Sequence, residues 1–285
     1  MDHNQQKMHN LIWRFFKRHP TIVIGSLILI IMIFFAIFAS QITPDPMRLN
    51  PINRLRPPGD GIWFGTDMFG RDIFARTIHG SKISLFVGIS VASISTFFGL
   101  LIGLLAGYNR LFDRLIMRVM DGIMAIPSIL LAIALVGLTG ASIQNVIIAI
   151  SIPEIPRIVR LVRSVVLTIK EQPYIDAAIS VGAKLHKILF RHILPNTLAP
   201  IIVQATYVCA SAMIWEAILS FLGAGTPPDI PTWGNIIAEG RVYFQRAPWI
   251  IFFPGLFLAI TVLSVNLLGD GLRDGVDPRI ARQMR

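Results

Sequence analysis

Residues 171–200, EQPYIDAAISVGAKLHKILFRHILPNTLAP, form a polar and charged stretch between two long apolar runs. Pro173 suits the first turn of a helix, where the backbone N–H that proline lacks is not needed. The helical period places on one face Tyr174, Ala178, Val181 and Leu185. The opposite face then carries Asp176, Ser180, Lys184 and Lys187. The stretch therefore predicts a helix with two different faces.

The second half of the stretch predicts a turn and another short helix. Gly182 lies where the first helix could end or bend, and the second helix can run to His192. We expect Pro195 to stop that helix before the next apolar run begins. Such a helix–turn–helix at a membrane surface would leave one face free to dock into a partner. From the pattern alone, an ordinary cytoplasmic loop lying on lipid headgroups explains the stretch equally well.

The composition identifies an integral membrane protein. Of 285 residues, 54% are hydrophobic and only 15% are charged, whereas soluble domains carry about a quarter charged residues. The net charge of +10 does not indicate nucleic-acid binding, because the basic residues lie beside apolar runs and not on a polar domain. Cys209 lies inside an apolar run and is interpreted as a packing residue. We expect the first apolar run to remain as an anchor, because it is too long for a signal peptide.

The apolar runs predict an all-α protein with six transmembrane helices. The expected spans are 20–42, 83–108, 115–138 with a kink at Pro127, one from about 143, 197–222 and 248–268. Residues 1–19 form a basic N-terminus and 273–285 a C-terminal tail. Residues 43–82 are expected to lie outside and to hold a short surface helix, capped by Thr66 or Asp67. The core is expected over 83–272, with the docking loop at 171–195.

The distribution of basic residues orients the chain. Of the 26 Lys and Arg residues, 18 fall in the segments 1–19, 110–118, 157–191 and 273–285, and 8 in 43–82 and 223–247. Cytoplasmic loops carry the excess of Lys and Arg in membrane proteins. The bias therefore predicts that both termini and the 171–195 loop are cytoplasmic.

Three carboxylates fall in or near the predicted spans. Glu154 stands between Pro153 and Pro156, and either Arg157 or Arg160 could neutralise it. A charge at that depth is costly, so a place in a translocation path remains the alternative. Glu216 is a second carboxylate in an apolar run, and polar packing is its simplest role. For Asp121, an interfacial ion pair with Arg118 is favoured over a proton site.

Several motifs resemble those of one family. Asp176-Ala177-Ala178, then Gly182, then the run HILPN at 192–196, is similar to the EAA loop of ABC-importer permeases, with Asp where Glu is usual. FGTDMFGRD at 64–72, EAILSFLG at 216–223 and NLLGDGLRD at 266–274 resemble the dipeptide/oligopeptide branch of those permeases. The resemblance extends over nearly the whole chain. It implies a MetI-like permease core in which the loop is a coupling helix.

The resemblance also implies a function and partners. The chain would form half of a pore for dipeptides, oligopeptides or related solutes in the bacterial inner membrane, as a multi-pass subunit. The partners would be a second homologous permease in a heterodimer, two ABC ATPase subunits and an extracytoplasmic solute-binding protein. The implied ATPase contacts are Tyr174, Asp176, Ala177, Ala178 and Gly182. The resemblance places Glu216 near the outer gate.

No catalytic, cofactor or metal motif occurs in the sequence. A GxxxxGK[ST] phosphate loop, HExxH and CxxC are all absent. We therefore expect no enzymatic activity, and any ATP hydrolysis must belong to another chain. The competing hypothesis is an ion-coupled secondary transporter that uses Glu154 and Glu216, although no convincing inverted repeat supports it. A membrane anchor without transport activity would leave both carboxylates unexplained.

Overall fold

The computed structural model describes residues 20–59 and 61–276, and within them the fold is built from helices with no extended strand. The expected N-terminal segment 1–19 and most of the C-terminal tail lie outside these residues. The longer helices are α2 (Pro20–Ile42), α3 (Ile73–Tyr108), α4 (Arg110–Met124), α5 (Ser128–Thr139), α6 (Ile143–Lys170), α9 (Leu194–Phe221) and α11 (Trp249–Val276). The short ones are α7 (Pro173–Ser180), α8 (Leu185–Ile188) and α10 (Trp233–Gly240). The all-α prediction is confirmed.

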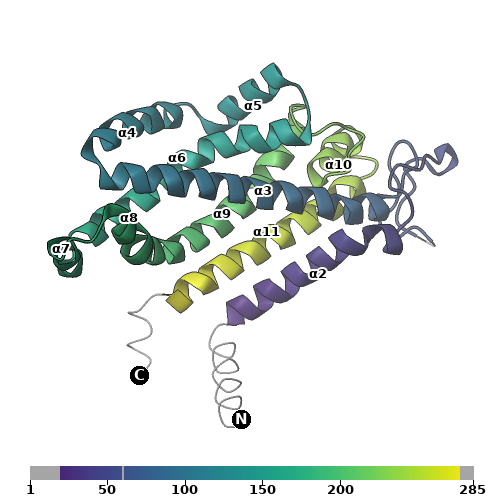
Figure 1. Cartoon of the computed structure of the whole chain (residues 1–285). Coiled ribbons are helices and arrows are strands. Elements are labelled where there is room, and N and C mark those ends of the chain that lie inside the picture. The colour runs from purple at the N-terminus through teal and green to yellow at the C-terminus, as the bar shows by residue number, and fades with distance from the viewer. Residues whose placement is uncertain (1–19, 60, 277–285) are drawn as a thin grey trace, which may run out of the picture.

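The long helices lie side by side, and the short ones close the two ends of the bundle (Figure 1). Helices α7 and α8 lie at one end, and α10 lies at the other. Gly271 of α11 packs against Ile22 of α2, so the chain enters and leaves the bundle at the same end. Below, the end of the bundle with α7 and α8 is called the α7 end, and the opposite end is called the α10 end.

Four helical stretches of the described chain are long and apolar enough to cross a membrane. They are Pro20–Ile42, Ile73–Tyr108, Leu185–Phe221 and Trp249–Asp274, and the bent pair α4–α5 would make a fifth. Helix α6 corresponds to the predicted fourth span, but it carries Glu154 near its middle and three arginines in its second half. It lies against α3, and Val159, Val162 and Val166 are fully buried. One side of this part of α6 is therefore covered by protein, while its arginines remain partly exposed.

A row of glycines brings α3 and α6 into close contact. Cβ atoms added at Gly99, Gly103 and Gly107 would lie only 2.5–2.6 Å from side-chain atoms of α6. The facing residues, Ile158, Val162 and Val166, repeat at the same four-residue spacing. Small residues at this spacing allow the two helices to approach closely.

The predicted short surface helix before the second span is wrong as a separate element. Helix α3 begins at Ile73, and Asp72 caps it by accepting a hydrogen bond from the Phe74 backbone N–H at 2.9 Å. Neither Thr66 nor Asp67 is the cap. Arg76 lies inside α3, and its guanidinium pairs with the carboxylates of Asp67 and Glu239.

The predicted kink at Pro127 is a complete break. Helices α4 and α5 are separate and meet at 86°. Proline disfavours helical conformation in the residue before it and removes a backbone donor, and the chain leaves the helix at residues 125–127. Pro153 and Pro156, in contrast, lie inside α6 without ending it.

The ion pair expected between Asp121 and Arg118 is also wrong. Arg160 of α6 binds the Asp121 carboxylate at 2.5 Å and joins α4 to α6. Arg163 binds Asp113 in the same way, with Nη2 2.7 Å from Oδ2. Arg160 and Arg163 therefore hold α4 against α6.

Candidate docking site at the α7 end

Helix α7 is attached to the bundle by one side chain and is otherwise exposed. Ile175 is 1% exposed and belongs to the main apolar core. Tyr174, Ile179 and Val181 are 46%, 50% and 88% exposed. Such apolar side chains, gathered on a short helix between two long ones, form a surface that a partner could cover.

The end of α7 is a Schellman turn centred on Gly182. The Ala183 N–H donates to the carbonyl of Ala178 at 3.0 Å, and the Gly182 N–H donates to Ile179 at 2.8 Å. Gly182 has a φ of +81°, the left-handed conformation that glycine adopts without strain. The predicted helix end is confirmed. The predicted apolar face does not continue as one helical stripe, because Val181 and Leu185 lie beyond the last helical residue, Ser180.

The residues predicted to contact an ATPase lie together on this helix and its turn. Asp176 and Ala177 are exposed, Ala178 is half-buried, and a Cβ added at Gly182 would meet nothing within 4 Å. Sequence reasoning missed Ile175, the anchor, and Ile179, an exposed apolar residue. The sequence of α7 does not show which side of the helix packs against the bundle. It therefore could not distinguish the buried Ile175 from the exposed Ile179.

The expected stop at Pro195 is wrong. Residues Leu185–Phe221 form one continuous helical stretch, in which α8 leads through a π-helical segment, Leu189–Ile193, into α9. Proline removes one backbone donor. The hydrogen-bond register changes in the π segment directly before it, so the helix continues through Pro195.

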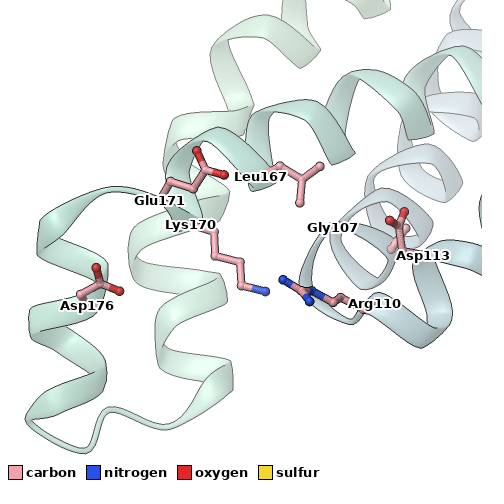
Figure 2. A pocket seen from close by; sticks show the side chains of 8 residues that line it. Gly107, Arg110, Asp113, Leu167, Lys170, Glu171 and Asp176 are labelled. Carbon is pink, nitrogen blue, oxygen red and sulfur yellow. The ribbon is translucent and has the colours of Figure 1, made fainter.

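A pocket of about 490 Å³ adjoins α7. It lies between the end of α3, the start of α4, the end of α6 and α7 itself (Figure 2). Its apolar lining comes from Ala106, Gly107 and Leu167, and its charged lining from Arg110, Asp113, Lys170, Glu171 and Asp176. Asp176 therefore belongs both to the exposed helix and to the pocket wall.

Glu154 lies in the interior near the middle of the bundle. Its side chain is 1% exposed, and Nη1 of Arg157 lies 3.1 Å from Oε1 and 3.3 Å from Oε2. Of the two expected partners, Arg157 is the one that neutralises it. The adjoining cavity holds only about 10 Å³, which leaves little room for a solute beside Glu154 in this conformation.

Glu216 lies at the α10 end and is fully buried. Its Oε1 accepts hydrogen bonds from Ser220 and Thr232, each at 2.8 Å. Its Oε2 has no hydrogen-bond partner among the described residues. The carboxyl group joins the end of α9 to the loop before α10, which agrees with a packing role in this conformation.

Sequence reasoning missed a second charged cluster at the α10 end. Arg76 is fully buried and donates to Asp67 at 2.9 Å and to Glu239 at 2.7 and 3.0 Å. Arg71 binds the same two carboxylates. Glu239 comes from α10, about 160 residues later in the chain, so no local spacing could reveal the cluster.

A bundle of long apolar helices that leaves a short helix exposed between two of them has the architecture of a multi-pass membrane permease that works with a partner protein. Residues 99–282 match the family described as binding-protein-dependent transport system inner membrane component. The chain belongs to that family. Residues 9–58 match the N-terminal transmembrane domain of oligopeptide transport permease C.

Two named relatives extend over nearly the whole chain. A probable peptide ABC transporter permease of Sinorhizobium fredii is 54% identical, covering 95% of this chain and 93% of that protein. The dipeptide transport system permease protein DppC of Alkalihalophilus pseudofirmus is 46% identical, covering 93% and 88%. The inward-facing MetNI methionine ABC transporter has a similar fold, with a TM-score of 0.52 and 21% identity, covering 68% of this chain and 94% of that chain.

These findings fix the class of the protein. It is an ABC-importer permease, a multi-pass component of the inner membrane and not a catalytic subunit. The MetI-like fold that the motifs implied is confirmed. A permease of this kind works with ATPase and binding-protein partners. The ion-coupled alternative finds no support in these similarities.

Proposed function

We propose that this chain forms half of the translocation pore of an ABC importer for dipeptides, oligopeptides or related solutes. A second, homologous permease completes the pore as a heterodimer, and two ATPase subunits dock beneath the pair. The named peptide and dipeptide permeases that resemble the chain support a peptide-like solute. The match to an oligopeptide permease N-terminal domain supports the same branch.

The α7 end faces the cytoplasm in this proposal. The segments that meet there, 110–118 and 157–191, contain 10 of the 26 Lys and Arg residues. The positive-inside rule therefore favours a cytoplasmic location for the exposed helix. The segment 43–72 and α10 then face outward, where a solute-binding protein delivers its cargo.

The ATPase docks on α7 through Tyr174, Asp176, Ala177, Ala178 and Gly182. The observation that carries this assignment is the exposure of α7, which keeps apolar side chains uncovered although only Ile175 ties it to the core. Small residues at 177 and 178 allow close approach, and Tyr174 supplies area for a partner to bury. The charge of Asp176 gives the contact an orientation.

Movement of the docked helix provides the coupling. Helix α7 follows α6 directly and leads through α8 into α9, so closure of the ATPases would pull on both long helices. Glu216 joins α9 to the outer loop and is our candidate for a residue at the outer gate. Glu154, on α6, is our candidate for a residue that borders the path when the pore opens.

Cysteine crosslinking tests the docking assignment. We expect Ala178→Cys, in a Cys209→Ser background, to form a crosslink with its ATPase subunit that changes when ATP is added. Val242→Cys is the matched control, because Val242 is 74% exposed at the α10 end. It should form no such crosslink. If the assembled transporter gives no crosslink at 178 or at neighbouring positions, the docking assignment is wrong.

A further inference from the structure

Two cationic side chains converge in the pocket beside α7. Figure 2 shows Lys170, from the end of α6, and Arg110, from the start of α4, pointing toward one another across the opening. Among the described residues, neither makes an ion pair. Like charges that face each other without a counter-ion repel, and a shared anion between them removes that cost.

The other charges of the pocket leave this pair available. Asp113 is already bound by Arg163 through two hydrogen bonds. Glu171 and Asp176 lie at the margin on the α7 side, and both are exposed to solvent. Arg110 is exposed as well, but neither carboxylate forms an ion pair with Arg110 or Lys170 in the part of the chain that the structure describes.

The position of Lys170 is fixed by its neighbours. Its Nζ donates to the backbone carbonyl of Tyr108 at 3.0 Å and lies 4.9 Å from the centre of the Tyr108 ring. An ammonium group has three donors, so two remain for a ligand. Arg110 offers a planar fork of donors, which suits the oxygens of a phosphate. Lys170 would form the fixed side of an anion site, and Arg110 would form the side that can adjust to the ligand.

The pocket lies where a lipid headgroup would be. Tyr108 ends the apolar helix α3, and aromatic residues at span ends mark the level of the headgroups. Along α3, exposed apolar side chains at four-residue spacing, Phe97, Leu101 and Leu105, lead to the same level. Acyl chains could lie along this row while the phosphate reaches the pocket, whose lining includes Ala106 and Gly107.

We infer that this pocket binds a phosphate group between Arg110 and Lys170, and that an anionic phospholipid of the cytoplasmic leaflet supplies it. Basic pockets between helices on the cytoplasmic side are suited to such headgroups. The bound lipid fills the space between the end of α3 and α7 next to the docking surface. Lipid binding is thereby assigned to Arg110 and Lys170, which are not among the residues proposed to contact the ATPase.

The test is lipid binding to the assembled, detergent-purified transporter, measured by native mass spectrometry with phosphatidylglycerol. We expect the variant Arg110→Gln/Lys170→Gln to bind phosphatidylglycerol at least about ten-fold more weakly than the wild type. Arg114→Gln/Arg118→Gln is the matched control. Both arginines are exposed on α4, outside the pocket, and the change in net charge is the same. This control should lower the affinity by less than about two-fold.

Two further arms identify the source of the phosphate. Phosphatidylcholine should bind the wild type more weakly than phosphatidylglycerol does, because its choline group cancels the charge of its phosphate. Millimolar inorganic phosphate should fail to displace phosphatidylglycerol, and displacement would overturn the assignment to a lipid. Equal loss in the pocket variant and the control would overturn the site itself. A last outcome would also overturn the lipid assignment. If the pocket variant still bound phosphatidylglycerol, and if a lipid-free sample of it lost its ATPase subunits, the two cations would belong to a contact with protein instead.

Discussion

The two ends of the bundle differ in the kind of contact that holds them together. At the α10 end, Arg76 is fully buried among the carboxylates of Asp67 and Glu239, and Glu216 accepts hydrogen bonds from hydroxyls of neighbouring segments. At the α7 end, one apolar residue, Ile175, holds an otherwise exposed helix. The α10 end also has exposed apolar residues, such as Val242, but charged and polar side chains tie its segments together, whereas α7 lacks such ties among residues 20–59 and 61–276.

This difference predicts that one end mainly determines the stability of the permease fold and the other its association with a partner protein. Buried charged groups that pair inside one chain contribute to the fold of that chain, and removing one partner leaves the others unpaired in the interior. Exposed apolar groups contribute little to the isolated fold, and their free energy is gained when a partner covers them. Substitutions at the α10 end should therefore destabilise the permease, whereas substitutions at the α7 end should weaken its assembly.

The largest loss of stability is expected for Asp67→Ala. The Asp67 side chain accepts hydrogen bonds from Arg71, Arg76 and two backbone N–H groups. Its removal leaves two buried guanidinium groups short of a partner, at a cost of about 3–5 kcal/mol. Thermal unfolding of the detergent-purified protein, followed by loss of the monodisperse species, measures the change. The control Asp229→Ala, at an exposed position of the same end, should leave the midpoint unchanged.

A smaller loss is expected for Thr232→Val, which keeps the shape of the side chain. The Thr232 hydroxyl donates to Glu216 at 2.8 Å and accepts from the Asn235 backbone N–H at 3.0 Å, as the cap of α10. Losing both bonds should cost about 1–3 kcal/mol. Thr232→Ser keeps the hydroxyl and should restore most of the loss in the same unfolding measurement. Equal midpoints for the valine and serine variants would show that the hydrogen bonds at Glu216 contribute nothing.

Gly182→Val should lower stability by about 1–2 kcal/mol, because a side chain disfavours the φ of +81° at this position. The strain falls in the turn after α7, where a Cβ has free space. We therefore expect normal membrane insertion and loss of ATP-driven uptake. Gly122→Val is the control, since Gly122 has equally free space but lies inside α4. Normal uptake by Gly182→Val would contradict a role of the turn in coupling.

The smallest effect on stability is expected for Ile179→Ser. Ile179 is 50% exposed, so the free energy of unfolding should change by no more than about 0.5 kcal/mol. The fraction of ATPase that co-purifies with the permease should nevertheless fall. Val242→Ser makes a similar change at the α10 end and should leave that fraction unchanged. A loss of ATPase in both variants would remove the distinction between the two ends.

The sequence predicted the local features well and the long-range contacts poorly. Apolar run length located the long helices, and the helix end at Gly182 followed from its place between two helical patterns. The sequence assigned no role to Arg76, because its partner, Glu239, lies 163 residues away. For the same reason Asp121 was assigned to the nearby Arg118, whereas the fold brings Arg160 to it. Side-chain pairing between helices depends on packing that a single sequence does not contain.

The effect of each proline on its helix was also not predictable from the sequence alone. Pro127 was expected to kink a helix and divides it, while Pro195 was expected to stop a helix and lies within one. Whether a helix survives a missing N–H depends on the hydrogen-bond register around it and on what the next helix packs against. The π-helical segment before Pro195 supplies such a register change, and its sequence has no recognisable signature.

The glycine seam between α3 and α6 has a mechanical consequence. At Gly99, Gly103 and Gly107 there is no gap in which one helix could slide along the other. Helices α3 and α6 should therefore behave as one thick beam. Such a beam resists bending more strongly than two separate rods do. With 36 residues, α3 extends for about 54 Å. Its far end carries Arg76 in the buried charge cluster, and α6 ends at α7, so a push on α7 should arrive at the opposite end as a tilt of the whole beam.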